Sequence, residues 1–268
     1  MKFPFSSFLG LKALVAFIFF VAIFANSCSV KNEKNSQKFL KEAFDSLLGK
    51  NPDWKKAKLL AAKAVKAEPG NYRAILLLAA AYEKTGQTDA AIDELKRAVK
   101  IAPNYFLSQY TLGRLYFEKG QFDNALTHLI NAHNLNSENS ETLFYLARTY
   151  QKLKQNKNAH KTYIELCKKN NFKKRVEPYN ELGTIYLMEK DLNNALKALI
   201  YAYRLDKENY KVIWNLAVLY DFYIKNPASA IAFYEQYQQI TLINPELVSK
   251  REFARKRIAE LSYRLKQK

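Results

Sequence analysis

The sequence predicts an all-α protein, a solenoid of helix-turn-helix hairpins closed by a C-terminal helix. Three observations predict it. Gly and Pro number only 7 each in 268 residues, which excludes a turn-rich β-sandwich and a fibrous chain. Aliphatic and aromatic residues make up 49%, which excludes a largely disordered chain. One set of residue types recurs about every 34 residues, and stacked helical hairpins are typical of such a period.

Residues 1–27 have the pattern of a signal peptide or an N-terminal membrane anchor. Lys2 and Lys12 are their only charges, and residues 13–25 form an unbroken apolar run. Such a run makes about 20 Å of helix, short of the roughly 30 Å of a bilayer's hydrocarbon core. That length is typical of a secretory segment.

Cys28 follows three small residues, as it does at the cleavage site of bacterial lipoproteins, which the segment resembles. Ala25 stands where that box usually has Leu. Lipidation of Cys28, an uncleaved anchor and free secretion therefore all stay open, and each exports the rest of the chain. We expect a membrane-anchored protein of the bacterial cell envelope that faces the periplasm. The polar stretch 28–37 is expected to be a flexible tether, and the one other cysteine, Cys167, a packing residue.

Several columns of residues carry the period. A leucine is followed by a small residue and, four positions on, by a tyrosine, which places Leu and Tyr on one helical face. Small residues in each helix allow two backbones to cross closely. The leucines are Leu78, Leu112, Leu146, Leu182 and Leu216; the small residues are Ala79, Gly113, Ala147, Gly183 and Ala217; a second column holds Ala57, Ala91, Ala125, Ala159, Ala195 and Ala230. Gly86, Gly120 and Lys190 lie at the expected turns inside hairpins.

The order L-[G/A]-x2-Y followed by alanine resembles the tetratricopeptide repeat (TPR) family. The resemblance implies a right-handed α-solenoid of six repeats, although the early Trp of the family is absent and the first unit lacks the Leu-Gly-Tyr triplet. The fourth unit carries two extra residues and the sixth carries one. The predicted units are 38–71, 72–105, 106–139, 140–175, 176–209 and 210–243, followed by a basic capping helix at 244–268 that starts with the capping pair Asn244-Pro245.

The family geometry also implies a concave groove lined by the first helix of each hairpin. Aromatic and Arg side chains are enriched at binding hot spots, so we expect the groove to grip a peptide or helix of a partner protein. The alternative is that the aromatic side chains pack between adjacent repeats. The predicted partner-binding residues are Tyr110, Arg114, Phe117, Phe144, Arg148, Lys152 and Trp214, and other groove positions include Glu141, Asn180, Thr184 and Asp221. A clamp for a C-terminal carboxylate is not supported, because only Asn215 stands at a matching position.

The net charge of +18 concentrates in two places. One is the stretch from Lys168 to Arg175, and the other is the last helix. Contact with an acidic polymer or an anionic lipid surface is one interpretation, and an ordinary solvated basic surface is the other. No nucleic-acid motif accompanies the charge, so no nucleic-acid partner is expected.

The sequence predicts no catalysis, no cofactor and no metal site. His128, His133 and His160 do not have metal-ligand spacing, and no phosphate loop or catalytic triad is present. The leading hypothesis is a non-enzymatic scaffold or adaptor that helps assemble an envelope machine: a pilus, the flagellar motor periphery, or an outer-membrane or peptidoglycan complex. The alternative is a basic module that docks on an acidic polymer or anionic lipid, and a third reading is a subunit that regulates an enzyme. The partner and the oligomeric state stay open.

Overall fold

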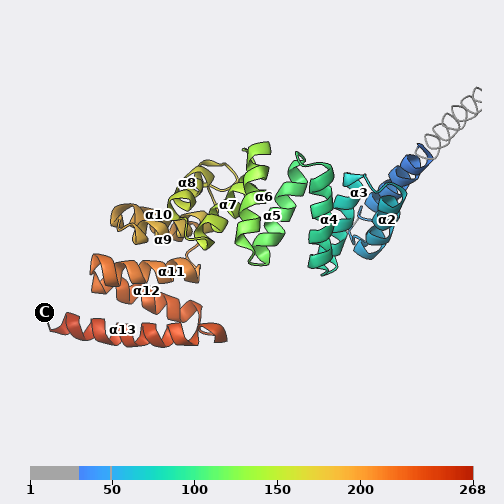
Figure 1. Ribbon diagram of the computed structural model, residues 1–268. Helices are drawn as coiled ribbons and strands as arrows, with labels where there is room; N and C mark the ends of the chain where they lie inside the picture. Colours follow the sequence, from blue (N-terminus) through green and yellow to red (C-terminus); the bar gives the residue numbers. More distant parts are fainter. Residues whose placement is uncertain (1–29, 49, 268) are drawn as a thin grey trace, which may run out of the picture. The chain divides into compact units, whose positions relative to one another are not determined.

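The computed structural model describes residues 30–48 and 50–267, and it divides into two compact units, one up to Lys119 and one from Gly120 on. The described residues contain helices and turns and no strand, so the predicted all-α class is confirmed (Figure 1). The predicted signal segment 1–27 and Cys28 lie outside the described residues. None of the helices within the described part has the length and hydropathy that a membrane span needs.

The N-terminal unit pairs its helices in the predicted hairpins. Residues 30–45 are helical and precede α2 (Trp54–Ala67), and the next hairpin is α3 (Tyr72–Lys84) with α4 (Thr88–Ile101). The unit ends with α5 (Phe106–Glu118). Its core joins successive hairpins, because Ala61 and Leu60 of α2 pack in one cluster with side chains of α3 and α4.

The first helix extends further upstream than the sequence suggested. Residues 30–37, predicted to be part of a flexible tether, are helical. Ser36 explains the difference, because it is fully buried and accepts a 3.0 Å hydrogen bond from the Asn71 side-chain amide. The helix therefore has a packed contact with the second hairpin that its polar composition does not reveal.

The C-terminal unit continues the pattern and ends with a long helix. It comprises α6 (Phe122–Leu135), α7 (Ser140–Lys152), α8 (Asn156–Lys168), α9 (Val176–Met188), α10 (Leu192–Leu205), α11 (Tyr210–Val218), η1 (Leu219–Ile224), α12 (Pro227–Ile240), η2 (Pro245–Leu247) and α13 (Val248–Lys266). Asn244 caps the turn η2 by accepting from the Glu246 N–H at 3.0 Å, and α13 then packs along α12 as the expected capping helix (Figure 1). The boundary between the units falls inside the predicted third repeat.

The repeat columns fulfil the packing role that their residue types predict. All six alanines of the second-helix column are fully buried. Gly183 of α9 lies so close to α10 that an added Cβ would meet the Leu199 Cγ at 2.6 Å. Asparagine caps three of the first helices: Asn71, Asn139 and Asn209 each accept a backbone N–H three residues on.

The turn inside each of the last five hairpins has one residue in the left-handed region. Gly86 and Gly120 have φ of 79° and 74°, and the same place is taken by Lys154, Lys190 and Lys225 at 58°, 62° and 59°. Each lies eight positions after its repeat leucine, except Lys225, which lies nine positions after Leu216. The extra residue of the sixth repeat therefore falls inside its first helix, and the chain absorbs it there as the π-helix η1.

Candidate partner-binding face

In the N-terminal unit the three predicted binding residues are buried or engaged with other side chains of the same unit. Arg114 is 18% exposed and donates to Glu83 at 2.7 Å and to Glu118 at 2.8 Å. Burial alone lowers the pKa of the Arg114 guanidinium, but the hydrogen bonds to both carboxylates outweigh it and raise the pKa above its ordinary value. Phe117 is buried, and the Tyr110 ring stacks on Phe106 at 5.8 Å.

In the C-terminal unit Phe144 is covered by the segment that carries the two extra residues of the fourth repeat. Phe172 of that segment is fully buried and its ring centroid lies 5.7 Å from that of Phe144. The Arg175 guanidinium lies over both rings, 4.3 Å from the Phe172 centroid and 5.3 Å from the Phe144 centroid. Arg148 approaches the same Phe144 ring at 5.3 Å. Phe144 is 9% exposed, so it offers a partner little surface.

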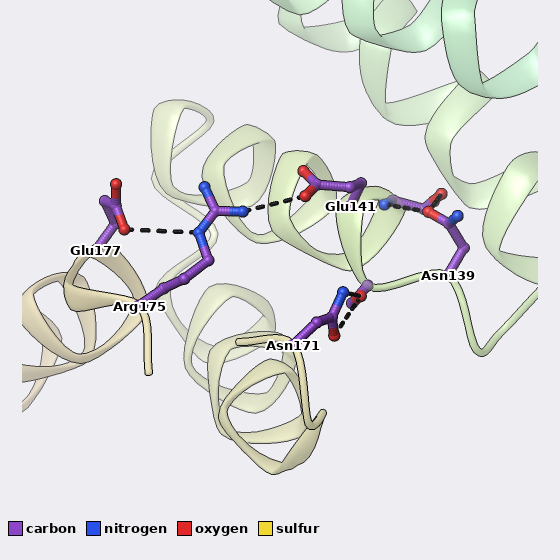
Figure 2. A network of polar contacts seen from close by, with 7 residues as sticks. Asn139, Glu141, Asn171, Arg175 and Glu177 are labelled. Carbon is purple, nitrogen blue, oxygen red and sulfur yellow. Dashed lines mark hydrogen bonds and ion pairs between the residues drawn. The ribbon is translucent and has the colours of Figure 1, made fainter. Parts of the chain in front are cut away.

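Polar contacts fix this inserted segment in place. Figure 2 shows Arg175 between two carboxylates, with Glu141 at 3.0 Å on the start of α7 and Glu177 at 3.8 Å on α9. The Asn171 side chain and the Ser140 hydroxyl exchange hydrogen bonds of 2.9 and 2.6 Å. The segment is therefore tied to the N-terminal end of α7, and it occupies the predicted groove positions Glu141 and Phe144.

Trp214 and Lys152 have contrasting surroundings. Trp214 of α11 is half-buried, with the ring centroids of Tyr237 and Phe253 at 5.0 and 5.8 Å and the Lys250 ammonium 5.0 Å from its own ring. The capping helix α13 thus covers one face of Trp214. Lys152 at the end of α7 is exposed. That these residues bind a partner stays a prediction.

Sequence reasoning missed a row of polar side chains that links successive first helices of the C-terminal unit. The Gln151 amide of α7 donates to Glu181 of α9 at 2.8 Å, and the Asn215 amide of α11 donates to Asn180 of α9 at 2.8 Å. Thr184 lies one turn after Asn180 on α9 and is half-buried. These residues stand at or beside predicted groove positions, so an amide-rich strip runs across α7, α9 and α11. The bonded pairs are 30 and 35 residues apart, close to the repeat period, and this spacing could have indicated in the sequence that they meet.

The two basic concentrations are partly neutralised within the fold. Lys169 pairs with Glu138 at 2.9 Å, as Arg175 does with Glu141. In α13, the Arg257 guanidinium makes a bidentate contact with Asp221 of η1 at 2.6 and 2.9 Å, and the Asp221 side chain is only 1% exposed. Lys225, Arg257 and Arg264 line a small hollow of about 180 Å³ beside this pair.

Two observations concern groups that could take part in catalysis. No group of three or more His, Cys, Asp or Glu side chains in them could hold a metal ion. Burial raises the pKa of the Cys167 thiol to about 12, which disfavours the reactive thiolate at neutral pH. The arrangement suits recognition of another polypeptide: amide donors and acceptors in a row, with basic side chains nearby.

Stacked helical hairpins with fully buried alanine columns define a helical-repeat protein. The family model for the tetratricopeptide repeat matches residues 50–115. The match shows the repeat in that stretch, which lies in the N-terminal unit, and it agrees with the resemblance that the repeat pattern predicted. Proteins built of such repeats are in general non-catalytic scaffolds that bind partner proteins or peptides.

Solved structures show the same fold at low sequence identity. Pseudomonas aeruginosa pilF is 14% identical with a TM-score of 0.63, and the match covers 80% of this chain and 95% of that one. YrrB, described as a TPR protein with an unusual peptide-binding site, is 18% identical with a TM-score of 0.61 over 69% of this chain and 93% of its own. MamA is 23% identical with a TM-score of 0.54 over 59% and 92%. No curated protein sequence matches the chain.

Proposed function

We propose that the protein is a non-enzymatic scaffold of the bacterial cell envelope that binds a peptide or helix of a partner protein along the first helices of its C-terminal unit. The amide-rich strip across α7, α9 and α11 carries the proposal. Side-chain amides both donate and accept, so they can satisfy the backbone of a bound peptide, whose polar groups must stay hydrogen-bonded when buried. YrrB, which has a similar fold, is described as binding peptides.

The charges near the strip favour an acidic or polar ligand. Arg148 and Lys152 follow one another along α7, and Lys211 is exposed on α11. The charge of Glu141 is compensated by Arg175, whereas Glu181 accepts from the neutral Gln151 amide and keeps its negative charge beside these three cations. A segment with carboxylates along one face would meet complementary potential here.

The envelope location rests on the N-terminal sequence alone. A basic start, an apolar run of secretory length and Cys28 after small residues support export with a lipid or an uncleaved anchor. The partner would then be another envelope protein, in a pilus, the flagellar motor periphery, or an outer-membrane or peptidoglycan complex. Incorporation of labelled palmitate that disappears in Cys28→Ala would support lipidation, and unchanged incorporation would exclude Cys28 as the acylated residue.

Site-specific photocrosslinking in intact cells tests the binding function. A photoreactive residue at Lys152, next to the strip, should give a discrete crosslinked partner. The matched control is the same residue at Lys197, an exposed lysine on the second helix α10. Equal crosslinking from both positions, or none from Lys152 with full-length protein present, would contradict a partner on the first-helix face.

A further inference from the structure

The turn between α12 and η2 displays two adjacent aliphatic side chains to water. Leu242 is 71% exposed and Ile243 is 93% exposed, and Ile243 has the largest exposed fraction of any large hydrophobic side chain among the described residues. Val248, at the start of α13, adds a third exposed aliphatic side chain at 45%. Single exposed apolar residues are ordinary on protein surfaces, whereas a cluster marks a contact surface.

The turn holds these side chains outward through a closed set of backbone hydrogen bonds. The Thr241 N–H donates to the Tyr237 carbonyl at 3.1 Å, and the Asn244 N–H donates to the Thr241 carbonyl at 3.0 Å. The Arg251 guanidinium donates to the carbonyls of both Thr241 and Asn244. Leu242 and Ile243 are thus bracketed on both sides, and their exposure is fixed by the conformation of the turn.

The aliphatic tip lies at the start of a helix with an excess of cationic side chains. Leu242 and Val248 line one hollow of about 230 Å³ together with Gln238, Arg251, Glu252 and Arg255, and Glu246 is exposed in the turn itself. The helix α13 carries seven Lys and Arg and two Glu, a net charge of 7 − 2 = +5. Arg255 and Lys256 are both exposed in its first half. In an anionic bilayer, hydrocarbon lies beneath acidic headgroups. Apolar side chains at the tip can therefore reach the hydrocarbon while basic side chains beside them contact the headgroups.

We propose that this tip, defined as Leu242, Ile243 and Val248 with Arg255 of the same hollow and the next residue of α13, Lys256, docks on an anionic lipid surface. The aliphatic side chains enter the interface, and the two cations contact lipid headgroups. Charge complementarity selects this occupant, because the apolar side chains stand at a turn that leads into α13, whose net charge is positive, with Glu246 and Glu252 as the carboxylates beside the tip. The inference is independent of peptide binding by α7, α9 and α11.

A fluorescence experiment on the full chain tests the docking apart from any binding by residues 1–29. Cys28→Ala and Cys167→Ala remove the native thiols, and Ile243→Cys receives an environment-sensitive dye. The labelled chain is reconstituted in vesicles of phosphatidylcholine alone or mixed with phosphatidylglycerol. The matched control carries the dye at Leu48→Cys, which replaces another aliphatic residue, 77% exposed, in the N-terminal unit.

We expect a blue shift at position 243 only with phosphatidylglycerol, and none at position 48. The shift should shrink as salt rises, since the screening length falls from about 10 Å at 0.1 M to about 3 Å at 1 M. Arg255→Gln with Lys256→Gln should reduce it. An equal shift with phosphatidylcholine alone, no shift with either vesicle, or a shift without vesicles that grows with protein concentration would each overturn the proposal; the last would indicate self-association.

Discussion

Gly183→Ala isolates the close approach of two helices within one hairpin. The added Cβ would stand 2.6 Å from Leu199 Cγ and 2.7 Å from its Cδ2, closer than real Cβ atoms come to their neighbours. Leu199 is fully buried and packs in the core with Leu187 and Leu216. Because the nearest atom is the branch carbon of Leu199, its whole side chain must move within a packed core.

Two effects of opposite sign compete in this variant. Alanine favours a helix interior over glycine by about 1 kcal/mol. Overpacking of a close-packed core typically costs about 1–3 kcal/mol. A contact this short belongs in the upper part of that range, so we expect a net loss of about 1–2 kcal/mol. For a domain of this size that lowers Tm by about 2–8 °C.

Urea and thermal unfolding followed by circular dichroism measure the effect, and a double-mutant cycle identifies its cause. Leu199→Ala alone should cost about 2–5 kcal/mol. In the Leu199→Ala background Gly183→Ala should become stabilising, because the obstacle is gone and only the helix propensity remains. Ala147 takes the same repeat position in α7, where a methyl group is already accommodated. If Gly183→Ala raised stability in the wild-type background, the reasoning about close approach would be refuted.

Three further predictions follow from single contacts. Lys190→Gly should stabilise the protein by about 0.5–1 kcal/mol in chemical denaturation, because φ of 62° strains a residue with a Cβ; a loss of stability would contradict this. Arg257→Leu should cost about 3–5 kcal/mol, because it leaves the Asp221 carboxylate buried without its ion pair and with the Tyr234 hydroxyl as a remaining donor. Asp221→Asn in the same chain should recover much of that loss, and equal stability of the single and double variants would contradict the pairing. In a Cys28→Ala chain, Cys167 should react with iodoacetamide at pH 8 far more slowly in the folded than in the unfolded state, since its folded pKa of about 12 leaves little thiolate. Above pH 9 the thiol ionises in the unfolded state first, so its contribution to the free energy of unfolding should fall as pH rises toward 12.

The repeat architecture could be predicted from the sequence because one physical constraint recurs at fixed spacing. Two helices that cross closely tolerate only small side chains, so the buried alanines and Gly183 mark each crossing. The turns were partly predictable: Gly86 and Gly120 indicated the left-handed position directly. Lys154 and Lys225 take the same conformation without a sequence signal of their own, and only their place in the period reveals it.

The candidate site was harder to predict, because a groove position does not determine what its side chain contacts. Arg114, chosen as a hot spot, is bonded to Glu83 of the preceding hairpin. Phe144 packs under Phe172, from a segment whose two extra residues have no counterpart in the other repeats. Trp214 meets Phe253 of the capping helix. Each contact joins residues about 30 to 40 positions apart. The repeat pattern predicts where the helices lie, but it does not predict which side chains of two helices touch.

The fourth and sixth repeats, which carry extra residues, each place an arginine against a predicted groove residue. The two groove residues, Phe144 and Asp221, belong to the first helices of these two repeats. The inserted segment sets Arg175 on Phe144, and the π-helix sets Asp221 against Arg257. Both groove residues are thereby buried, and the amide strip from Gln151 to Asn215 lies between them along the chain. Under the proposed function, a partner that follows the first helices would meet within that interval the side chains of this hydrogen-bonded strip and the exposed Lys152 and Lys211 beside it. The interval, more than the aromatic residues that first suggested a groove, is where substitutions should alter partner choice without altering the fold.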